Sequence, residues 1–274
     1  MMLKKCLSLF ITGMILIAIG GIGIATLAIN GINLNGISIG PSSAANKVNA
    51  SDAVTIEETE EITSLDFSAN AGIFTVVRGE NFGIATNADT VNYELTDGCL
   101  KIANTTSTSF MSFEDVAVEI IVTIPERSFK EVKFSLNAGE FYADDIIADK
   151  FTFDMNAGEA VLNNISAITT ADISINMGEC TFNNSELSNS KINMDAGEMT
   201  FEECKLTGEN NINLDLGEVS ITLLGKRSDY KLDIENDFGE VNVKGDETSD
   251  NISPIGTIKF NLDLGELNID FTEE

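Results

Sequence analysis

From residue 131 onward, apolar and polar positions alternate in short stretches that recur about every 20 residues. In one of them Ile192, Met194 and Ala196 are apolar, and Met199 and Phe201 form a second apolar set after a shift of phase. Alternation with a period of two is typical of a strand with one buried face. The pattern predicts strands whose apolar side chains share one core, with a corner of the chain at each shift of phase.

A phrase of the type Asn/Asp-X-Gly-Glu marks these shifts. It occurs seven times, with its glycines at the predicted repeat corners Gly139, Gly158, Gly178, Gly197, Gly217, Gly239 and Gly265. The steps between them are 19, 20, 19, 20, 22 and 26 residues. Helical hairpin repeats need more than about thirty residues, so this period predicts one coil of a β-solenoid. Glycine supplies the positive φ that such a bend needs.

Two further polar positions divide each repeat. A polar pair follows five and six residues after the glycine, as Asp144-Asp145, Asn163-Asn164, Asn183-Asn184 and Glu202-Glu203. A third polar stretch, such as Ser188-Asn189-Ser190, precedes the next coil. We therefore expect an all-β fold: a parallel β-solenoid over residues 131–274, triangular, with three short strands per coil. The apolar surface that one coil buries stabilises it by less free energy than the ordering of its backbone costs, so a coil is stable only when others stack on it.

Residues 54–130 contain strand-like runs separated by turn residues. Asp97-Gly98 between two such runs is typical of a β-hairpin turn. We expect an N-terminal antiparallel β cap over the first edge of the solenoid, because a bare sheet edge invites aggregation. At the other end, Asp270, Glu273 and Glu274 would discourage pairing between molecules.

The first part of the chain is apolar. Residues 7–29 carry no charge and follow Lys4 and Lys5. As a helix they would span about 34 Å, enough for a hydrocarbon core of ~30 Å. The lysines predict a single-pass anchor with residues 1–6 in the cytoplasm and the C-terminal domain outside the membrane. Residues 30–53 then form a flexible tether. A cleaved signal peptide is the alternative, although its apolar region is usually shorter.

Charge and composition narrow the function. The chain has 44 acidic and 16 basic residues, a net charge of −28, and no histidine. Every acidic residue follows position 50, so the predicted extracytoplasmic part repels nucleic acid and attracts cations. Without histidine, the usual general base near neutral pH is missing. We expect a non-catalytic domain without a cofactor, which binds a cationic ligand or another envelope protein but no nucleic acid.

Stacked coils would place the glutamates of the phrase in a row, about 4.8 Å apart. We interpret them as solvated corner residues, with the preceding asparagines stacked through amide hydrogen bonds. The alternative is a cation stripe, because Ca²⁺ prefers six to eight oxygen ligands. Its candidate residues are Glu198, Asp215, Glu218 and Asp237. In that case Ca²⁺ would raise the melting temperature.

The cysteines follow neither a metal-binding nor a redox spacing. Cys99, Cys180 and Cys204 lie beyond the apolar segment, and no two of them form a CxxC pair. We interpret them as small buried side chains without a disulfide.

Several weak motifs occur in a characteristic order. They are Ala69-Asn-Ala-Gly72 followed by Ile73-Phe-Thr-Val, then Asp97-Gly-Cys-Leu-Lys-Ile, then Val118-Glu-Ile-Ile-Val-Thr-Ile-Pro125, then Phe134-Ser-Leu-Asn-Ala-Gly-Glu140. Over residues 55–270 the chain resembles the bacterial adhesin-type β-strand-repeat family, domain-of-unknown-function family 4097. The resemblance implies an extracytoplasmic β-solenoid, often membrane-tethered and linked to envelope functions. It transfers no catalytic or ligand-binding residue.

Four functions fit these features. The leading hypothesis is an adhesin-like or envelope-sensing binding module on a membrane anchor. A Ca²⁺-binding structural solenoid and a plain structural spacer are alternatives. A carbohydrate-active β-helix enzyme is another, and it would need carboxylates clustered with arginine or lysine in a groove. In the sequence the carboxylates of the phrase are regularly spaced instead, and the basic residues are scattered singly.

Overall fold

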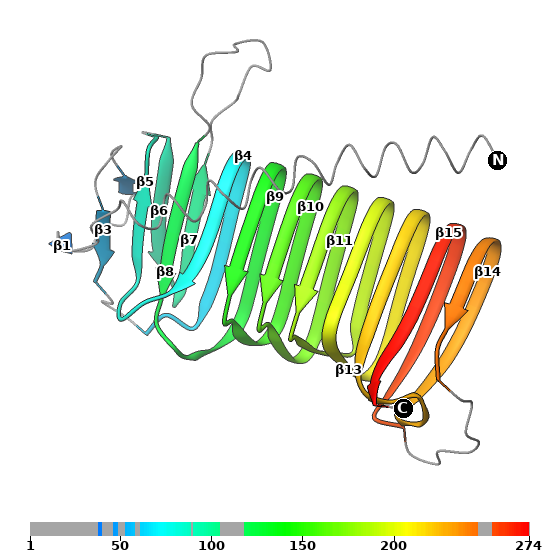
Figure 1. The fold of residues 1–274 in the computed structure, drawn as a ribbon. Coiled ribbons are helices and arrows are strands. Elements are labelled where there is room, and N and C mark those ends of the chain that lie inside the picture. The colour runs from blue at the N-terminus through cyan, green and yellow to red at the C-terminus, as the bar shows by residue number, and fades with distance from the viewer. Residues whose placement is uncertain are drawn as a thin grey trace, which may run out of the picture.

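The computed structural model describes residues 38–39, 46–48, 53–57, 61–88, 90–104, 118–245 and 254–273. In these ranges the chain forms fifteen strands of one sheet and a single 3₁₀ turn, η1 (Arg227–Asp229). Most of the sheet is parallel and coils on itself, so that bent strands stack along one axis (Figure 1). The predicted all-β parallel solenoid is confirmed.

Seven strands make up the stack of coils. In chain order they are β4 (Ser64–Arg78), β9 (Ser128–Asp144), β10 (Ile147–Asn163), β11 (Ser166–Asn183), β13 (Ser190–Lys226), β14 (Tyr230–Val243) and β15 (Gly256–Glu273), with the short β12 (Glu186–Ser188) between β11 and β13. Strand β13 is long enough for two coils. The expectation of three separate short strands per coil was wrong, because hydrogen bonding continues through the glycine corner and each coil is largely one bent strand.

The polar pair after each glycine forms a second corner. Its second residue has a left-handed backbone in four successive coils, with φ of 58° at Asp145, 54° at Asn164, 49° at Asn184 and 52° at Glu203. Asparagine and aspartate tolerate this conformation better than other residues with a side chain. The sequence therefore located this corner correctly.

The core is one continuous apolar column inside the coils. In β10, Phe151, Phe153 and Met155 and then Ala160 and Leu162 are at most 1% exposed. Aromatic rings contact one another from coil to coil; the rings of Phe182 and Phe201, for example, are stacked with centroids 5.3 Å apart. Because every core side chain packs against the coils above and below, stability is shared along the whole column.

One part of the core prediction was wrong. The apolar residue directly before each glycine, such as Ala196, was expected to face inward, but Ala196 is partly exposed and its equivalent Met177 is 52% exposed. Four residues separate the last core residue before the bend, Met155 in β10, from the first one after it, Ala160. The bend at the glycine occupies these four positions, so alternation does not extend through it.

A mixed set of strands covers the first edge of the stack. The two halves of β4 pair in parallel with β7 and β8, and β5 and β6 add antiparallel neighbours to these, so the predicted cap is antiparallel only in its outer pairings. The bounds are β1 (Ser38–Ile39), β2 (Asn46–Val48), β3 (Ala53–Ile56), β5 (Gly83–Thr86), β6 (Val91–Thr96), β7 (Cys99–Asn104) and β8 (Glu119–Ile124). Asp97 and Gly98 form the predicted turn between β6 and β7, with φ of 53° and 71°.

The parallel stack begins earlier than predicted. Strand β4 lies in the range 54–130 that was expected to be the cap, yet it pairs in parallel with β9 and places Gly72 against Gly139. The phrase around Gly72 lacks only its glutamate, because Ile73 occupies that position. The first coil is therefore built from residues 64–78 rather than from residue 131 onward.

The order of the last two coils departs from the sequence. Strand β15 lies between β13 and β14, so the C-terminal strand is internal and β14 forms the end of the stack (Figure 1). The prediction that Asp270 and Glu273 protect the end was therefore wrong; Glu274 lies outside the described residues. Strand β14 has Asn236 in register with the buried Leu262 of β15. The more apolar strand takes the position with neighbours on both sides.

The predicted membrane anchor, residues 7–29, and residues 1–6 lie outside the described residues, as does most of the predicted tether, 30–53. In the part of the chain that the structure describes, no helix has the length and apolar character needed to cross a membrane.

Candidate functional site: the glycine-corner face

Stacking turns the repeated phrase into parallel rows along one edge of the solenoid. We call this surface the glycine-corner face and define it by three rows. The glycine row, in spatial order, is Gly72, Gly139, Gly158, Gly178, Gly197, Gly217, Gly265 and Gly239. The apolar row precedes it by one residue, as Ala71, Ala138, Ala157, Met177, Ala196, Leu216, Leu264 and Phe238. The glutamate row follows it, as Glu140, Glu159, Glu179, Glu198, Glu218, Glu266 and Glu240.

The glycine row is built by close backbone contact. Gly158 and Gly178 have φ of +142° and +136°, a region that side chains disfavour. A Cβ on Gly178 would stand 1.9 Å from the carbonyl oxygen of Gly158, and one on Gly158 would meet Gly139 in the same way. No other residue fits in the row, which leaves a strip of bare backbone between its two neighbours.

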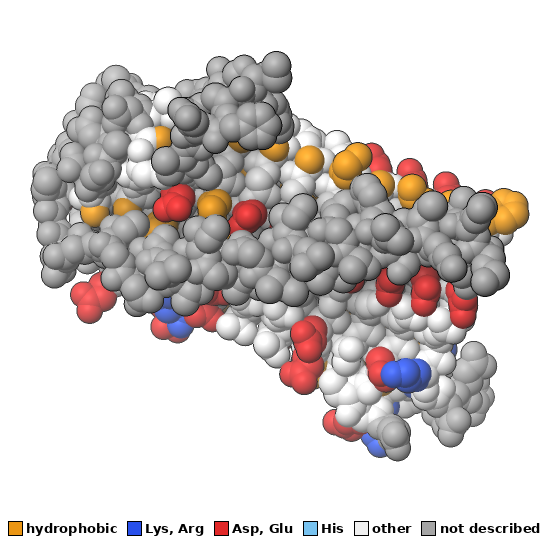
Figure 2. Space-filling view, turned by 45° about the horizontal axis from the view of Figure 1, so that its top comes forward, with side chains coloured by type: hydrophobic (Ala, Val, Ile, Leu, Met, Phe, Trp, Pro, Cys, Tyr) orange, Lys and Arg blue, Asp and Glu red, His pale blue; other side chains and the backbone are white. Residues whose placement is uncertain are grey.

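The apolar row is exposed. Met177 is 52%, Leu216 42%, Leu264 43% and Phe238 74% exposed, while the other positions carry alanine. Figure 2 shows apolar side chains following one edge of the molecule, with acidic side chains beside them. Exposed apolar side chains aligned over several coils form a continuous patch, and such patches mark interaction surfaces.

On the outer side of the apolar row lie asparagines and then aspartates. The amide of Asn156 donates to Asn137 Oδ1 at 2.7 Å, and that of Asn176 donates to Asn156 Oδ1 at 2.9 Å. The predicted amide stacking is confirmed for these three coils. From Asp195 onward the position is aspartate, which has no proton to donate when ionised. The face is therefore more acidic toward the β14 end.

The members of the glutamate row differ in their partners. Tyr142 donates to Glu140 Oε2 at 3.0 Å, and Ser220 and Asn268 donate to Glu218 Oε1 at 3.0 and 3.1 Å. The three carboxylates between these ends, those of Glu159, Glu179 and Glu198, form no side-chain hydrogen bond or ion pair with any described residue.

Burial and mutual repulsion act on these three carboxylates. Partial burial, together with the charge of Glu140, raises the pKa of Glu159. Burial and then the charges of Glu198 and Glu159 raise the pKa of Glu179, and burial with the charge of Glu218 raises that of Glu198. The ionised form of the row is thus disfavoured by its surroundings, and a bound positive charge would relieve this repulsion.

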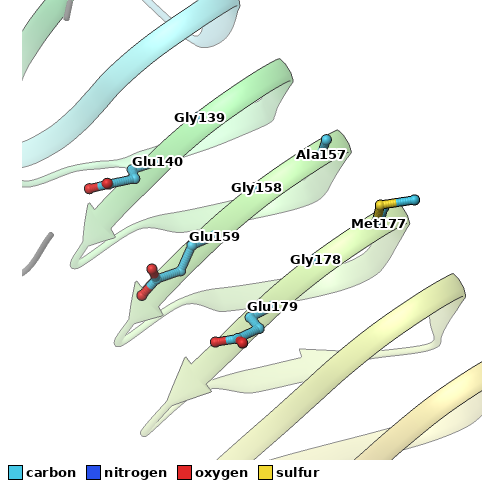
Figure 3. Close-up of a pocket in the computed structure, with 8 residues that line it drawn as sticks. All are labelled: Gly139, Glu140, Ala157, Gly158, Glu159, Met177, Gly178 and Glu179. Atoms are coloured by element: carbon cyan, nitrogen blue, oxygen red, sulfur yellow. The ribbon is translucent and has the colours of Figure 1, made fainter. Parts of the chain in front are cut away.

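A groove follows the glycine row. Its volume is about 310 Å³, and it is lined by Gly139, Glu140, Ala157, Gly158, Glu159, Met177, Gly178 and Glu179. In Figure 3 the three glutamates extend to one side of the glycines, and Ala157 and Met177 extend to the other. The groove therefore has a backbone floor, one apolar wall, and a second wall formed by the side chains of Glu140, Glu159 and Glu179.

The four residues proposed for a cation stripe are only partly brought together. Glu198 and Glu218 are neighbours in the glutamate row, close enough for the charge of Glu218 to raise the pKa of Glu198. Asp215 lies beyond the apolar row from them, and the coil formed by β15 separates it from Asp237 on β14. Among the described residues, no three His, Cys, Asp or Glu side chains are grouped closely enough to hold one metal ion.

Sequence reasoning missed the apolar row, because it assigned those residues to the core. A signal was present: the position varies between alanine, methionine, leucine and phenylalanine, whereas a packed core position tolerates little change in volume. The prediction of cysteines without a disulfide is confirmed for the three described ones. Cys180 and Cys204 are buried and free, and Cys99 is free and half-buried. Burial raises the pKa of the Cys204 thiol to about 11.

The chain matches the sequence profile of a known protein family. The sequence profile of a family described as Toastrack DUF4097 matches residues 47–272. Comparison with curated proteins finds no match.

Three solved structures are similar to the chain. A "putative cell adhesion protein" from Clostridium sporogenes is 17% identical, with a TM-score of 0.40 and coverage of 84% of this chain and 100% of that one. A "putative adhesin" from Bacteroides fragilis is 12% identical, with a TM-score of 0.33 and coverage of 85% and 100%. A "putative lipid binding protein" from Parabacteroides distasonis is 11% identical, with a TM-score of 0.30 and coverage of 85% and 98%.

Proposed function

Because the chain belongs to the Toastrack DUF4097 family, and its fold aligns repeated side chains in rows, we propose that it is a non-catalytic, adhesin-like binding module of the cell envelope. Its ligand is cationic and docks on the glycine-corner face. The observation that carries this proposal is the central part of the glutamate row. Glu159, Glu179 and Glu198 are half-buried carboxylates with raised pKa values and no cationic partner among the described residues.

Two features support a binding role over catalysis. The sequence contains no histidine, so a general base near neutral pH would have to be a carboxylate or a lysine. The three central glutamates, Glu159, Glu179 and Glu198, have similar surroundings, because burial and a neighbouring carboxylate raise the pKa of each. An acid–base pair needs the opposite, two groups whose surroundings separate their pKa values.

The envelope location rests on the N-terminal sequence. Residues 7–29 are uncharged and long enough to span a bilayer, and Lys4 and Lys5 place their N-terminal side in the cytoplasm. The acidic domain then lies outside the membrane, where cationic molecules reach it.

A titration of the full chain in nonionic detergent with trilysine tests the binding role. We expect measurable binding by calorimetry that weakens about two- to fivefold for each glutamate of the row changed to glutamine, as for partly exposed ion pairs. The matched control is Glu202→Gln/Glu209→Gln, which removes the same charge as Glu159→Gln/Glu179→Gln but at other corners. Equal weakening by both pairs would show an unspecific effect of net charge and refute the site.

Proteolysis of intact cells tests the location. An added protease that cannot enter the cell is expected to digest residues 54–274 while cytoplasmic proteins remain whole. Protection of this domain in intact cells, with digestion only after lysis, would refute an extracytoplasmic placement.

A further inference from the structure

The groove on the glycine-corner face has a shape and charge pattern that select among cations. We infer that its occupant is a linear polyamine in which three methylene groups separate successive amines. This inference rests on the proposed function, because it names the class of cationic ligand that the same face binds.

The first step is the apolar character of the groove. Its floor is glycine backbone, and its outer wall is formed by Ala157 and the side chain of Met177, which is 52% exposed. A strongly hydrated metal ion gains nothing from such a wall. An aliphatic chain is stabilised by contact with it, by about 25 cal/mol per Å² of apolar surface removed from water. A volume of about 310 Å³ lies at the lower end of the range for small-molecule sites.

The second step is the spacing of the opposite wall. Parallel pairing places equivalent residues of adjacent coils about 4.8 Å apart, and Glu159 is in register with Glu179, and Glu179 with Glu198. Two amines joined by three methylenes are separated by four bonds, which extend to about 5 Å. Each ammonium of such a chain therefore lies opposite one carboxylate, and the match holds over several coils without bending the ligand.

The same spacing disfavours an extended peptide. Side chains on one face of a strand repeat every second residue, about 6.8 Å. Lysines of a strand lying along the groove would move out of register with the carboxylates after one or two coils. A polyamine also enters a narrow groove more easily, because it has no backbone amides that would lose their hydrogen bonds to water.

The third step concerns which carboxylates are available. Glu140 and Glu218 already accept hydrogen bonds from Tyr142 and from Ser220 and Asn268, respectively. The three glutamates between them accept none from the described residues. Of these three, Glu159 and Glu179 line the groove, and Glu198 follows in the next coil of the same row. A triamine that lies along the groove and continues to this next coil places its three ammonium groups against Glu159, Glu179 and Glu198, and its methylenes against the apolar wall.

Two triamines of equal charge test this inference by calorimetry with the full chain in nonionic detergent. Bis(3-aminopropyl)amine matches the coil spacing. Bis(5-aminopentyl)amine, with about 7.5 Å between nitrogens, places its outer amines between coils although it is more apolar. We expect the propyl compound to bind at least about fivefold more tightly, equivalent to losing one ion pair in the longer compound.

Variants locate the site and separate the inference from the proposed function. Glu179→Gln and Met177→Gln are expected to weaken the propyl triamine, while Glu209→Gln, at another corner, leaves it unchanged. Both test positions are partly exposed, so the fold is retained. If trilysine or the pentyl triamine binds as tightly, with the same sensitivity to Glu179→Gln, the face binds cations but the inferred spacing is wrong. If no cationic probe responds to Glu179→Gln, both proposals fail.

Discussion

Along the inner side of the second corner, one residue interrupts a row of hydrogen bonds. The amide of Asn163 donates to Asp144 Oδ1 at 2.6 Å, and that of Asn183 donates to Asn163 Oδ1 at 2.8 Å. The next coil has Glu202 in register with Asn183. A carboxylate has no proton to donate, and Asn183 Oδ1 is buried without a hydrogen-bond partner among the described residues. A buried acceptor without a donor lowers stability.

Glu202→Asn is therefore expected to stabilise the protein. The new amide continues the row and donates to Asn183 Oδ1, which should raise the free energy of unfolding by about 0.5–1.5 kcal/mol. Chemical denaturation of the full chain measures this. Asp149→Asn, which removes one exposed corner charge outside the row, is the control and should change stability by less than about 0.5 kcal/mol. Equal stabilisation by both variants would assign the effect to net charge.

At the scale of the coil, the glycine corner sets the distance between neighbouring strands. From Gly139 to Gly217, every glycine of the row has the carbonyl oxygen of the preceding glycine within 2.0 Å of where a Cβ would stand. A substitution therefore pushes two coils apart instead of displacing a flexible side chain. The same contact brings the glutamates of the row close together, so close packing and charge repulsion have one origin.

Gly178→Ala is expected to destabilise the chain by at least about 3 kcal/mol, because backbone strain at positive φ adds to a clash with the backbone of Gly158. Denaturation of the full chain measures the loss. Gly79→Ala is the comparison, since a Cβ there would stand 3.0 Å from the Thr123 side chain and 3.6 Å from the backbone oxygen of Asn81, without a positive φ. Similar losses in the two variants would contradict a special role for the glycine row.

The glutamate row also predicts how stability depends on pH. A carboxyl group with a raised pKa in the folded chain binds its proton more tightly there than in the unfolded chain, so protonation favours folding. The melting temperature should therefore rise as the pH is lowered from neutral toward the ordinary glutamate value of 4.5.

Glu179→Gln separates this effect from the acidity of the whole chain. It removes one titrating group and the repulsion on both neighbours, so it should raise the melting temperature at neutral pH and flatten the pH dependence. Glu209→Gln serves as the control and should retain the slope of the parent chain. A slope that is the same in all three proteins would contradict coupling within the row.

At the scale of the molecule, the two ends of the stack are covered in different ways. At the first end, β7 and β8 pair in parallel with the free edge of β4, and β6 and β5 pair antiparallel with them. At the other end, the only described strand that pairs with β14 is β15, and the β14 side chains Leu232, Ile234, Val241 and Val243 are partly buried. The least stable coil is thus not the last one in the sequence.

Hydrogen exchange distinguishes this arrangement from stacking in sequence order. Amides of β15 have strands on both sides and should exchange more slowly than those of β14, although β15 ends at the C-terminus. Exchange followed by mass spectrometry of the full chain gives both rates from separate peptides. Slower exchange in β14 than in β15 would contradict the inserted position of β15.

The sequence alone determined the repeat and its period, because a residue pattern that recurs every 20 positions fixes which side chains lie above one another. It located the glycine corner, the left-handed second corner, the hairpin at Asp97-Gly98 and the stacked asparagines. Each of these depends on local backbone chemistry or on contacts between equivalent positions. Such features follow from the repeat once the coils are stacked.

Tertiary structure decided the rest. The direction of Met177 and its equivalents depends on how sharply the chain bends at the glycine, which alternation does not encode. The order of β14 and β15 depends on which of two similar strands gains more free energy from burial on both sides. Strand β15 has the apolar Leu262 where β14 has the polar Asn236, so β15 gains more. The groove exists only because both bare backbone and exposed apolar side chains recur at the same corner in adjacent coils.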